Sequence, residues 1–379
     1  MDKNTIIGFV LIAALLIGFS WYTQPSEEDI AKQRMQDSIT ALAKKKAEES
    51  RNAKAQASNQ NAQNNVNADT AAVFYKSLSG KAQNIILKNS KLELTLSTKG
   101  GTVEKAVIKD FKDNKGNKDL TLFDSKDQSL KFMLEGKETN IITSDLYFTP
   151  SNITDSTVTM TAVGSNGRSL VMNYKLGKNY LLHFSLKANG MSGLFSPNYN
   201  KLDIEWTDHC RQQEKGFTFE NRYASLTYHF TDGGTDYISE TSEKVDEKIE
   251  DAIDWVAFKN QFFSAVMIAK DDLGTNSLMT SIPQEKGSGY LKQYGAKVKT
   301  SFDPTGNNST ELEFYYGPND FRLLQKIEKE STFNKDLELH RLVYLGWPLF
   351  RIINRWFTLY VFDWLTGLNI NMGIVLILI

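Results

Sequence analysis

Two short runs, "SLVMNYKL" at residues 169–176 and "YLLHFSL" at residues 180–186, decide the fold class of this 379-residue chain. In each run a large apolar side chain recurs at every second position: Leu170, Met172, Tyr174 and Leu176, then Leu182, Phe184 and Leu186. Alternation of this kind places the apolar side chains on one face of a β-strand. Both runs are therefore predicted to be strands with one buried face.

The same period recurs through the middle of the chain, in "KLELTLS" at 91–97, "KLDIEW" at 201–206 and "ELEFYY" at 311–316. Glycine- and asparagine-rich segments such as "KGG", "GSNGR" and "TDGGT" supply turns between the runs. No long helices alternate with the strands. We therefore predict a mainly β fold, with a large antiparallel β-sandwich over residues 73–330.

Composition excludes several classes of site. The chain has one cysteine, Cys210, so no internal disulfide can form, and no Cys/His set has the spacing of a zinc or iron–sulfur site. Cys210 is expected to be a small buried hydrophobe. A net charge of −1 gives no indication of nucleic-acid binding. No cofactor, metal or nucleic acid is expected.

The first 72 residues read as a tether. Residues 5–23 are uncharged and end in Trp21 and Tyr22, the aromatic residues expected at a membrane interface. We interpret residues 1–23 as an uncleaved membrane anchor; the rival, a cleaved signal peptide, would carry a small-residue cleavage site. Residues 24–72 are polar and predict a partly helical stalk followed by a flexible linker.

Two segments connect the sandwich to the C-terminal part of the chain. "DWVAFKNQFFSAVMIA" at 254–269 is read as a buried strand pair that bends at "KNQ". A strand ending at Tyr316 is followed by Gly317 and Pro318, and then by a helix that Asn319 or Asp320 would cap.

Residues 331–367 contain a second membrane-directed pattern. A helix starting at Pro348 would present a broad apolar face, with Arg351 and Arg355 on the other side, and would end at Asp363 and Gly367. An arginine at the bilayer centre costs at least about 2.5 to 3.5 kcal/mol, so this helix is predicted to lie in the headgroup plane. The alternative is a terminal core helix of the β domain.

Residues able to catalyse are few. His183 and His229 fall within predicted strands, as surface, bridging or turn residues. His209, with Asp208 and Glu205, follows a strand end and is the best acid/base candidate. It supports an alternative function, a membrane-tethered periplasmic carbohydrate-binding or mutarotase-like protein with His209 and Glu205 as its site.

The combined order of these segments resembles the N-terminal part of insertases of the YidC/Oxa/Alb family, in the asparagine-rich form of the Bacteroidetes. The resemblance rests on "WVAFKNQFF" at 255–263, "YYGP" at 315–318, "LGWPLF" at 345–350 and "LNINMGIVLIL" at 368–378. Met372 departs from it, because the family usually has an aromatic residue there. The signature positions are Trp255, Lys259, Phe262, Phe263, Tyr316, Gly317, Pro318, Asn371 and Gly373.

The resemblance implies a periplasmic super-sandwich, similar to sugar-binding and mutarotase folds, that has no enzymatic activity. It assigns insertion to a C-terminal core of five membrane helices around a hydrophilic groove. Residues 368–379 would begin the second membrane helix, and the groove's cationic residue would lie beyond Ile379. We therefore expect the chain to be the N-terminal portion of a longer insertase, unable to insert clients alone.

The resemblance also implies location and partners. The chain would sit in the bacterial inner membrane with residues 24–367 in the periplasm, in contact with the lipid bilayer and nascent inner-membrane proteins. The Sec translocon and its accessory subunits are further partners that the sequence leaves open. Membrane-surface contacts are expected from Trp347, Phe350, Arg351, Arg355 and Trp356.

Overall fold

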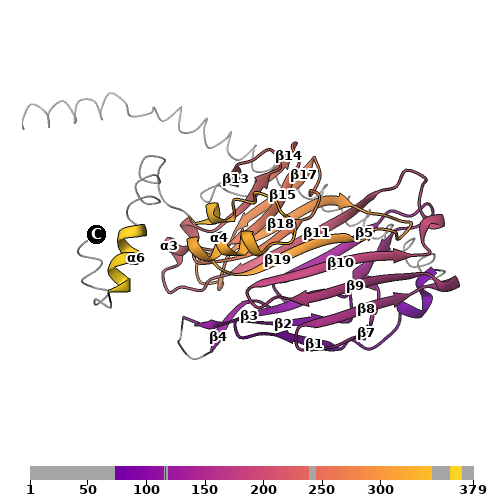
Figure 1. Cartoon of the computed structure of the whole chain (residues 1–379), viewed down its shortest axis with the longest axis horizontal. Helices are drawn as coiled ribbons and strands as arrows, with labels where there is room; N and C mark the ends of the chain where they lie inside the picture. The colour runs from indigo at the N-terminus through magenta and orange to yellow at the C-terminus, as the bar shows by residue number, and fades with distance from the viewer. Residues whose placement is uncertain (1–72, 115, 117, 239–244, 344–358, 369–379) are drawn as a thin grey trace, which may run out of the picture. The chain divides into compact units, whose positions relative to one another are not determined.

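The structure, a computed structural model, describes residues 73–114, 116, 118–238, 245–343 and 359–368. Within these residues the strands form three antiparallel sheets, which confirms the predicted mainly β fold (Figure 1). Helices are short and few by comparison with the strands.

In two of the three sheets the spatial order of the strands differs from their order in the sequence. The four-stranded sheet contains, in spatial order, β1 (Asn84–Lys88), β2 (Leu92–Ser97), β3 (Val103–Lys112) and β4 (Asp119–Phe123). The nine-stranded sheet contains β13 (Thr235–Tyr237), β12 (Ser225–Phe230), β15 (Ile253–Lys259), β16 (Phe263–Ala269), β19 (Thr310–Pro318), β10 (Leu181–Asn189), β9 (Ser169–Leu176), β8 (Thr157–Val163) and β7 (Thr149–Ser151). The six-stranded sheet contains β14 (Val245–Ile249), β17 (Ser277–Pro283), β18 (Tyr290–Ser301), β11 (Lys201–Arg211), β5 (Gln128–Leu134) and β6 (Ile141–Ile142).

The two runs that predicted the fold form neighbouring strands. β9 and β10 pair in register, with Tyr174 opposite Phe184 and Met172 opposite Leu186, so the apolar residues of both runs share one face. Tyr174 is buried there, and its hydroxyl donates a hydrogen bond to the carbonyl oxygen of Gly101 at 2.5 Å. The bond ties the nine-stranded sheet to the turn between β2 and β3.

Aromatic contacts connect the sheets across the core. The Trp206 ring of β11 stacks on the Phe258 ring of β15 with centroids 4.0 Å apart, which joins the six-stranded and nine-stranded sheets. The four-stranded sheet contacts the same large sheet through Phe123 of β4, whose ring lies 5.3 Å from that of Tyr316 on β19. The nine-stranded sheet is therefore the shared layer of the sandwich.

Every residue of β15 and β16 is buried, as expected for continuous apolar runs covered on both faces. This confirms the predicted strand pair over 254–269. Leu324 and Ile327 of α4 (Phe321–Glu330) join the same buried cluster. The carboxylate of Asp320 accepts a hydrogen bond from the backbone N–H of Leu323 at 2.7 Å and caps α4, as one of the two predicted alternatives.

The remaining helical segments are short. They are η1 (Tyr75–Ser77), η2 (Thr143–Asp145), η3 (Ser165–Gly167), η4 (Ser192–Leu194), α3 (Phe217–Arg222), η5 (Leu339–Leu342) and α6 (Leu359–Gly367). Among the residues that the structure describes, no helix combines the length and the apolar character needed to cross a bilayer.

Several predictions concern residues outside the described ranges. These are the anchor with Trp21 and Tyr22, the stalk and linker, the first part of the interfacial helix with Trp347, Phe350, Arg351, Arg355 and Trp356, and the final segment with Asn371 and Gly373. The described part of the predicted interfacial helix is α6, which ends at Gly367.

Candidate functional site: the connector clamp

Residues 331–343 leave the sandwich, and we call this segment the connector. It follows α4 and then runs back along it, because the His340 ring lies 5.3 Å from the Phe321 ring at the start of that helix. The backbone N–H of Leu339 donates to the Glu328 carboxylate at 3.2 Å. The connector therefore ends close to the point where α4 began.

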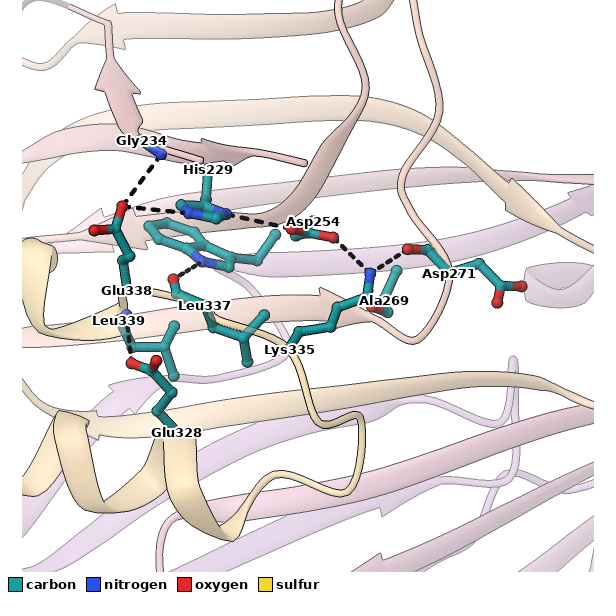
Figure 2. Close-up of polar contacts among 11 residues, drawn as sticks. His229, Gly234, Asp254, Ala269, Asp271, Glu328, Lys335, Leu337, Glu338 and Leu339 are labelled. Atoms are coloured by element: carbon teal, nitrogen blue, oxygen red, sulfur yellow. Dashed lines mark hydrogen bonds and ion pairs between the residues drawn. The ribbon is translucent and has the colours of Figure 1, made fainter. Parts of the chain in front are cut away.

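One tryptophan ties the connector to the sandwich. The indole Nε1–H of Trp255, on β15, donates a hydrogen bond to the carbonyl oxygen of Leu337 at 2.7 Å (Figure 2). Both side chains are fully buried. Because a buried indole N–H needs an acceptor, this single bond fixes the connector's height above the strand.

A histidine beside Trp255 lies between two carboxylates. His229 of β12 is 1% exposed and stacks on the Trp255 ring, with centroids 5.8 Å apart. Its Nδ1 is 3.4 Å from Asp254 Oδ2, and its Nε2 is 3.6 Å from Glu338 Oε2 (Figure 2). The imidazole thus bridges a carboxylate of the sheet and one of the connector.

Lys335 completes the arrangement from the connector side. Its ammonium Nζ donates to Asp254 Oδ1 at 2.5 Å and to the carbonyl oxygens of Ala269 and Asp271. Burial acts to raise the pKa of Asp254, but the neighbouring His229 and Lys335 outweigh it and hold that pKa below 3.8. We call Trp255, His229, Asp254, Lys335 and Glu338 the connector clamp.

A second carboxylate holds the start of the connector. Glu313 of β19 is fully buried, and its Oε1 accepts hydrogen bonds from the N–H of Thr332 at 2.9 Å and from the Thr332 hydroxyl at 2.7 Å. His183 Nδ1 lies 3.0 Å from the same oxygen. These partners lower the pKa of Glu313 against the opposing effect of burial. His183 is therefore a bridging residue, as one of its predicted roles proposed.

This chemistry favours holding over catalysis. The clamp consists of charge pairs and a donated indole N–H, and none of its five members is a serine, cysteine or threonine that His229 could activate as a nucleophile. In the described ranges, no group of three or more His, Cys, Asp and Glu side chains could hold a metal ion. What the arrangement can do is fix the path by which the chain leaves the sandwich.

The structure brings the two described sequence signatures together. Phe263 pairs with Pro318 and Ala265 with Tyr316, so "WVAFKNQFF" and "YYGP" lie side by side on β16 and β19. A Cβ at Gly317 would come 2.6 Å from the Tyr315 hydroxyl oxygen, so glycine is required by space. That hydroxyl in turn donates to the carbonyl oxygen of Pro318 at 2.6 Å.

The other signature residues have structural contacts as well. Lys259 is 6% exposed, and its ammonium donates to the carbonyl oxygen of Tyr223 at 2.8 Å. The Phe263 ring meets that of Phe111 edge-on at 5.1 Å. Phe262 differs from the rest, because its side chain is 45% exposed.

The acid/base candidates are not brought together. Glu205 and His209 share one face of β11 but are four residues apart, or about 13 Å along a strand. Glu205 lies 4.0 Å from Lys297, and the His209 ring faces Tyr290 at 5.6 Å. Asp208 points to the opposite, buried face, where burial and the nearby Asp127 raise its pKa well above 3.8.

Cys210 is buried, as predicted, and burial raises the pKa of its thiol. Sequence reasoning missed the roles of His229, Asp254, Lys335 and Glu338. One signal was available: Asp254 begins an otherwise apolar run, and a buried carboxylate needs a partner.

Comparisons with known proteins agree with this architecture. A family model described as "YidC periplasmic domain" matches residues 84–360. A curated relative from Phocaeicola vulgatus, named "Membrane protein insertase YidC", is 48% identical over 380 aligned residues, which cover 100% of this chain and 60% of the relative. The chain thus spans about three fifths of that relative's length.

Two solved structures are more distant. The periplasmic domain of Thermotoga maritima YidC is 12% identical, with a TM-score of 0.28 and coverage of 65% of this chain and 89% of that one. A galactose mutarotase-like protein from Lactobacillus casei is 11% identical, with a TM-score of 0.40 and coverage of 62% and 100%. By the family match over most of its described residues, the chain belongs to the family of YidC periplasmic domains.

Proposed function

We propose that this chain is the anchor and periplasmic part of a membrane protein insertase that assists the insertion, folding and assembly of inner-membrane proteins. The observation that carries the proposal is the 48% identity, along the whole chain, to a protein named as an insertase. The proposed partners are the lipid bilayer and nascent membrane proteins, with the Sec translocon as a further partner.

The proposed placement follows the sequence pattern. Residues 1–23 would anchor the chain in the inner membrane, residues 24–72 would be a stalk and linker, and residues 73–330 would be the periplasmic sandwich. Residues 331–367 would connect the sandwich to an interfacial helix that contacts lipid through Trp347, Phe350, Arg351, Arg355 and Trp356. Residues 368–379 would begin the next span.

In this proposal the sandwich is a scaffold and the connector clamp is its working part. The clamp holds the connector through charged and indole contacts to β12 and β15, and it therefore sets where the membrane-directed residues emerge. No catalytic role is proposed, because Glu205 and His209 do not converge on a common point.

The test is replacement in living cells. A chimera would carry residues 1–379 in place of the matching part of the Phocaeicola vulgatus insertase, in a strain depleted of its own insertase. We expect growth and client insertion to be restored. A chimera that reaches the membrane in normal amounts but restores neither would contradict the proposal.

Matched variants separate the scaffold from the alternative sugar site. In the chimera, Asp254→Asn should impair client insertion, because it leaves Lys335 without its charge partner. His209→Ala should leave insertion unchanged, because that side chain's ring contact is with Tyr290, outside the clamp.

A further inference from the structure

One end of the sandwich carries exposed aromatic side chains where the chain departs. At this end β12 begins at Ser225, directly opposite Lys259 at the end of β15. The backbone N–H of Asn319, just before α4, donates to the carbonyl oxygen of Phe262 at 2.6 Å. We call α3, the turn 260–262 and the first turn of α4 the exit end.

Phe262 is held outward by a braced turn. The Asn260 side-chain oxygen accepts hydrogen bonds from the N–H groups of Phe262 at 3.0 Å and Phe263 at 2.7 Å. The Asn319 amide nitrogen donates to the carbonyl oxygens of Asn260 at 3.2 Å and Gln261 at 3.3 Å. Phe262 nevertheless remains 45% exposed, so the turn holds an apolar ring in water.

Phe219 is displayed in the same way from α3. Its side chain is 57% exposed, with its ring 5.3 Å from that of Tyr223. α3 is fixed beneath it, because the buried Glu220 carboxylate accepts hydrogen bonds from the N–H of Gln213, and Lys259 binds the carbonyl oxygen of Tyr223. Two rigid elements thus present one phenylalanine each.

Cationic side chains accompany these rings. Lys215 and Arg222 are on either side of Phe219 in the sequence, and Lys215 is exposed. The Arg322 guanidinium carbon, at the start of α4, lies 4.8 Å from the ring centroid of Tyr360 on α6. Exposed aromatic rings with flanking cations are typical of surfaces that lie at a lipid headgroup layer.

The chain's path identifies the occupant of this surface. The connector returns to the exit end, where His340 contacts Phe321. In the sequence, Trp364 of α6, which is 65% exposed, and the apolar run that starts at Met372 follow within 32 residues of that histidine. The exposed rings are therefore on the side of the sandwich from which apolar segments continue.

We propose that Phe219 and Phe262 dock the exit end of the sandwich onto the headgroup region of the bilayer. The rings enter the interface from a fixed scaffold, so the sandwich is oriented relative to the membrane as well as tethered to it. This inference rests on the proposed function in one respect, the membrane location of the chain.

A lipid-contact measurement tests the docking. The full chain, with Cys210→Ala as background, is reconstituted in vesicles of phosphatidylethanolamine and phosphatidylglycerol. An environment-sensitive fluorophore is attached at Thr218→Cys, a position beside Phe219 that leaves both rings in place. We expect quenching by a nitroxide carried on the lipid. The control reporter, Asn307→Cys, is exposed near the start of β19, about 26 Å along the strand from Pro318, and should not be quenched.

Two paired variants carry the decision. Phe219→Asp with Phe262→Asp should reduce quenching at residue 218 to the level of the Asn307 reporter, whereas Phe219→Trp with Phe262→Trp should retain it. Equal quenching of the aspartate and tryptophan pairs, or a Thr218 reporter as water-exposed as the control, overturns the docking. If the unmodified chimera then still restores growth, the proposed function stands without this inference.

Discussion

The connector clamp and a cluster around Arg211 combine the same residue types with opposite outcomes. In the clamp, His229, Asp254 and Lys335 join segments far apart in the sequence, and the histidine and aspartate are buried. In the Arg211 cluster, the guanidinium binds Asp124 and Asp127, whose other oxygen accepts from the Tyr290 hydroxyl at 2.8 Å. That cluster borders an open polar cavity of about 520 Å³.

The difference lies in what covers each cluster. The connector lies over the clamp, so each charge must find a partner inside the protein. Beside the Arg211 cluster, Asp208 faces the interior and its Oδ1 lacks a hydrogen-bond partner within the described residues. A carboxylate's effect on stability therefore depends on the segment packed over it. Four predictions test that statement, each on the free energy of unfolding of the chain in detergent micelles, measured with urea.

The largest effect is expected at Trp255. Trp255→Ala removes a fully buried ring and the donor to Leu337, and should destabilise the fold by about 3 to 5 kcal/mol. Trp255→Phe keeps most of the ring and loses the N–H, so its cost should be about 1 to 3 kcal/mol. Trp364→Ala, at an exposed tryptophan, is the control. Equal effects at the two tryptophans would refute the role given to the clamp.

Asp254→Asn should cost about 3 kcal/mol at pH 7, because it leaves the Lys335 ammonium without its anionic partner. Its matched control is Asp119→Asn at the exposed Lys112–Asp119 pair, where less than about 1 kcal/mol is expected. The pKa of Asp254 is lowered in the fold, so its contribution is present above pH 3.8 and is lost as pH falls below that value. The difference between the unmodified chain and Asp254→Asn should therefore shrink below about pH 4.

Asp208→Asn should have the opposite sign. The pKa of Asp208 is raised, so the stability it contributes is present below pH 3.8 and is lost as pH rises toward its folded pKa. The variant should gain on the unmodified chain as pH rises, and be more stable by about 1 kcal/mol at pH 7. A variant that is less stable than the unmodified chain at every pH would show that Asp208 is held as a paired anion.

The smallest effect is expected at His209. This side chain lies on the outer face of β11, so His209→Ala should change stability by less than about 0.5 kcal/mol. Titration of the unmodified chain with a panel of monosaccharides should release no heat, because Glu205 and His209 lie about 13 Å apart along the strand. Saccharide binding that disappears in His209→Ala would restore the sugar-site alternative.

The period-two runs were sufficient to predict the sheets, because a strand's buried face is written locally at every second residue. The paired signatures of β16 and β19 could also be found as sequence motifs. The clamp could not be predicted in this way. Trp255 donates to a backbone carbonyl 82 residues later, and any residue type at Leu337 would offer the same acceptor. His229 is likewise placed by β12 and β15 pairing, which no local pattern specifies.

The doubled-back path of the connector has a mechanical consequence. Tension applied at Val343 would load its contacts in sequence, beginning with His340 and Leu339 at α4 and continuing through Glu338 and Leu337 to Lys335. Contacts loaded one at a time yield at low force and reform when tension falls. The connector would thus act as a fuse between the membrane and the sandwich, because it can extend before any strand is pulled from the sheet.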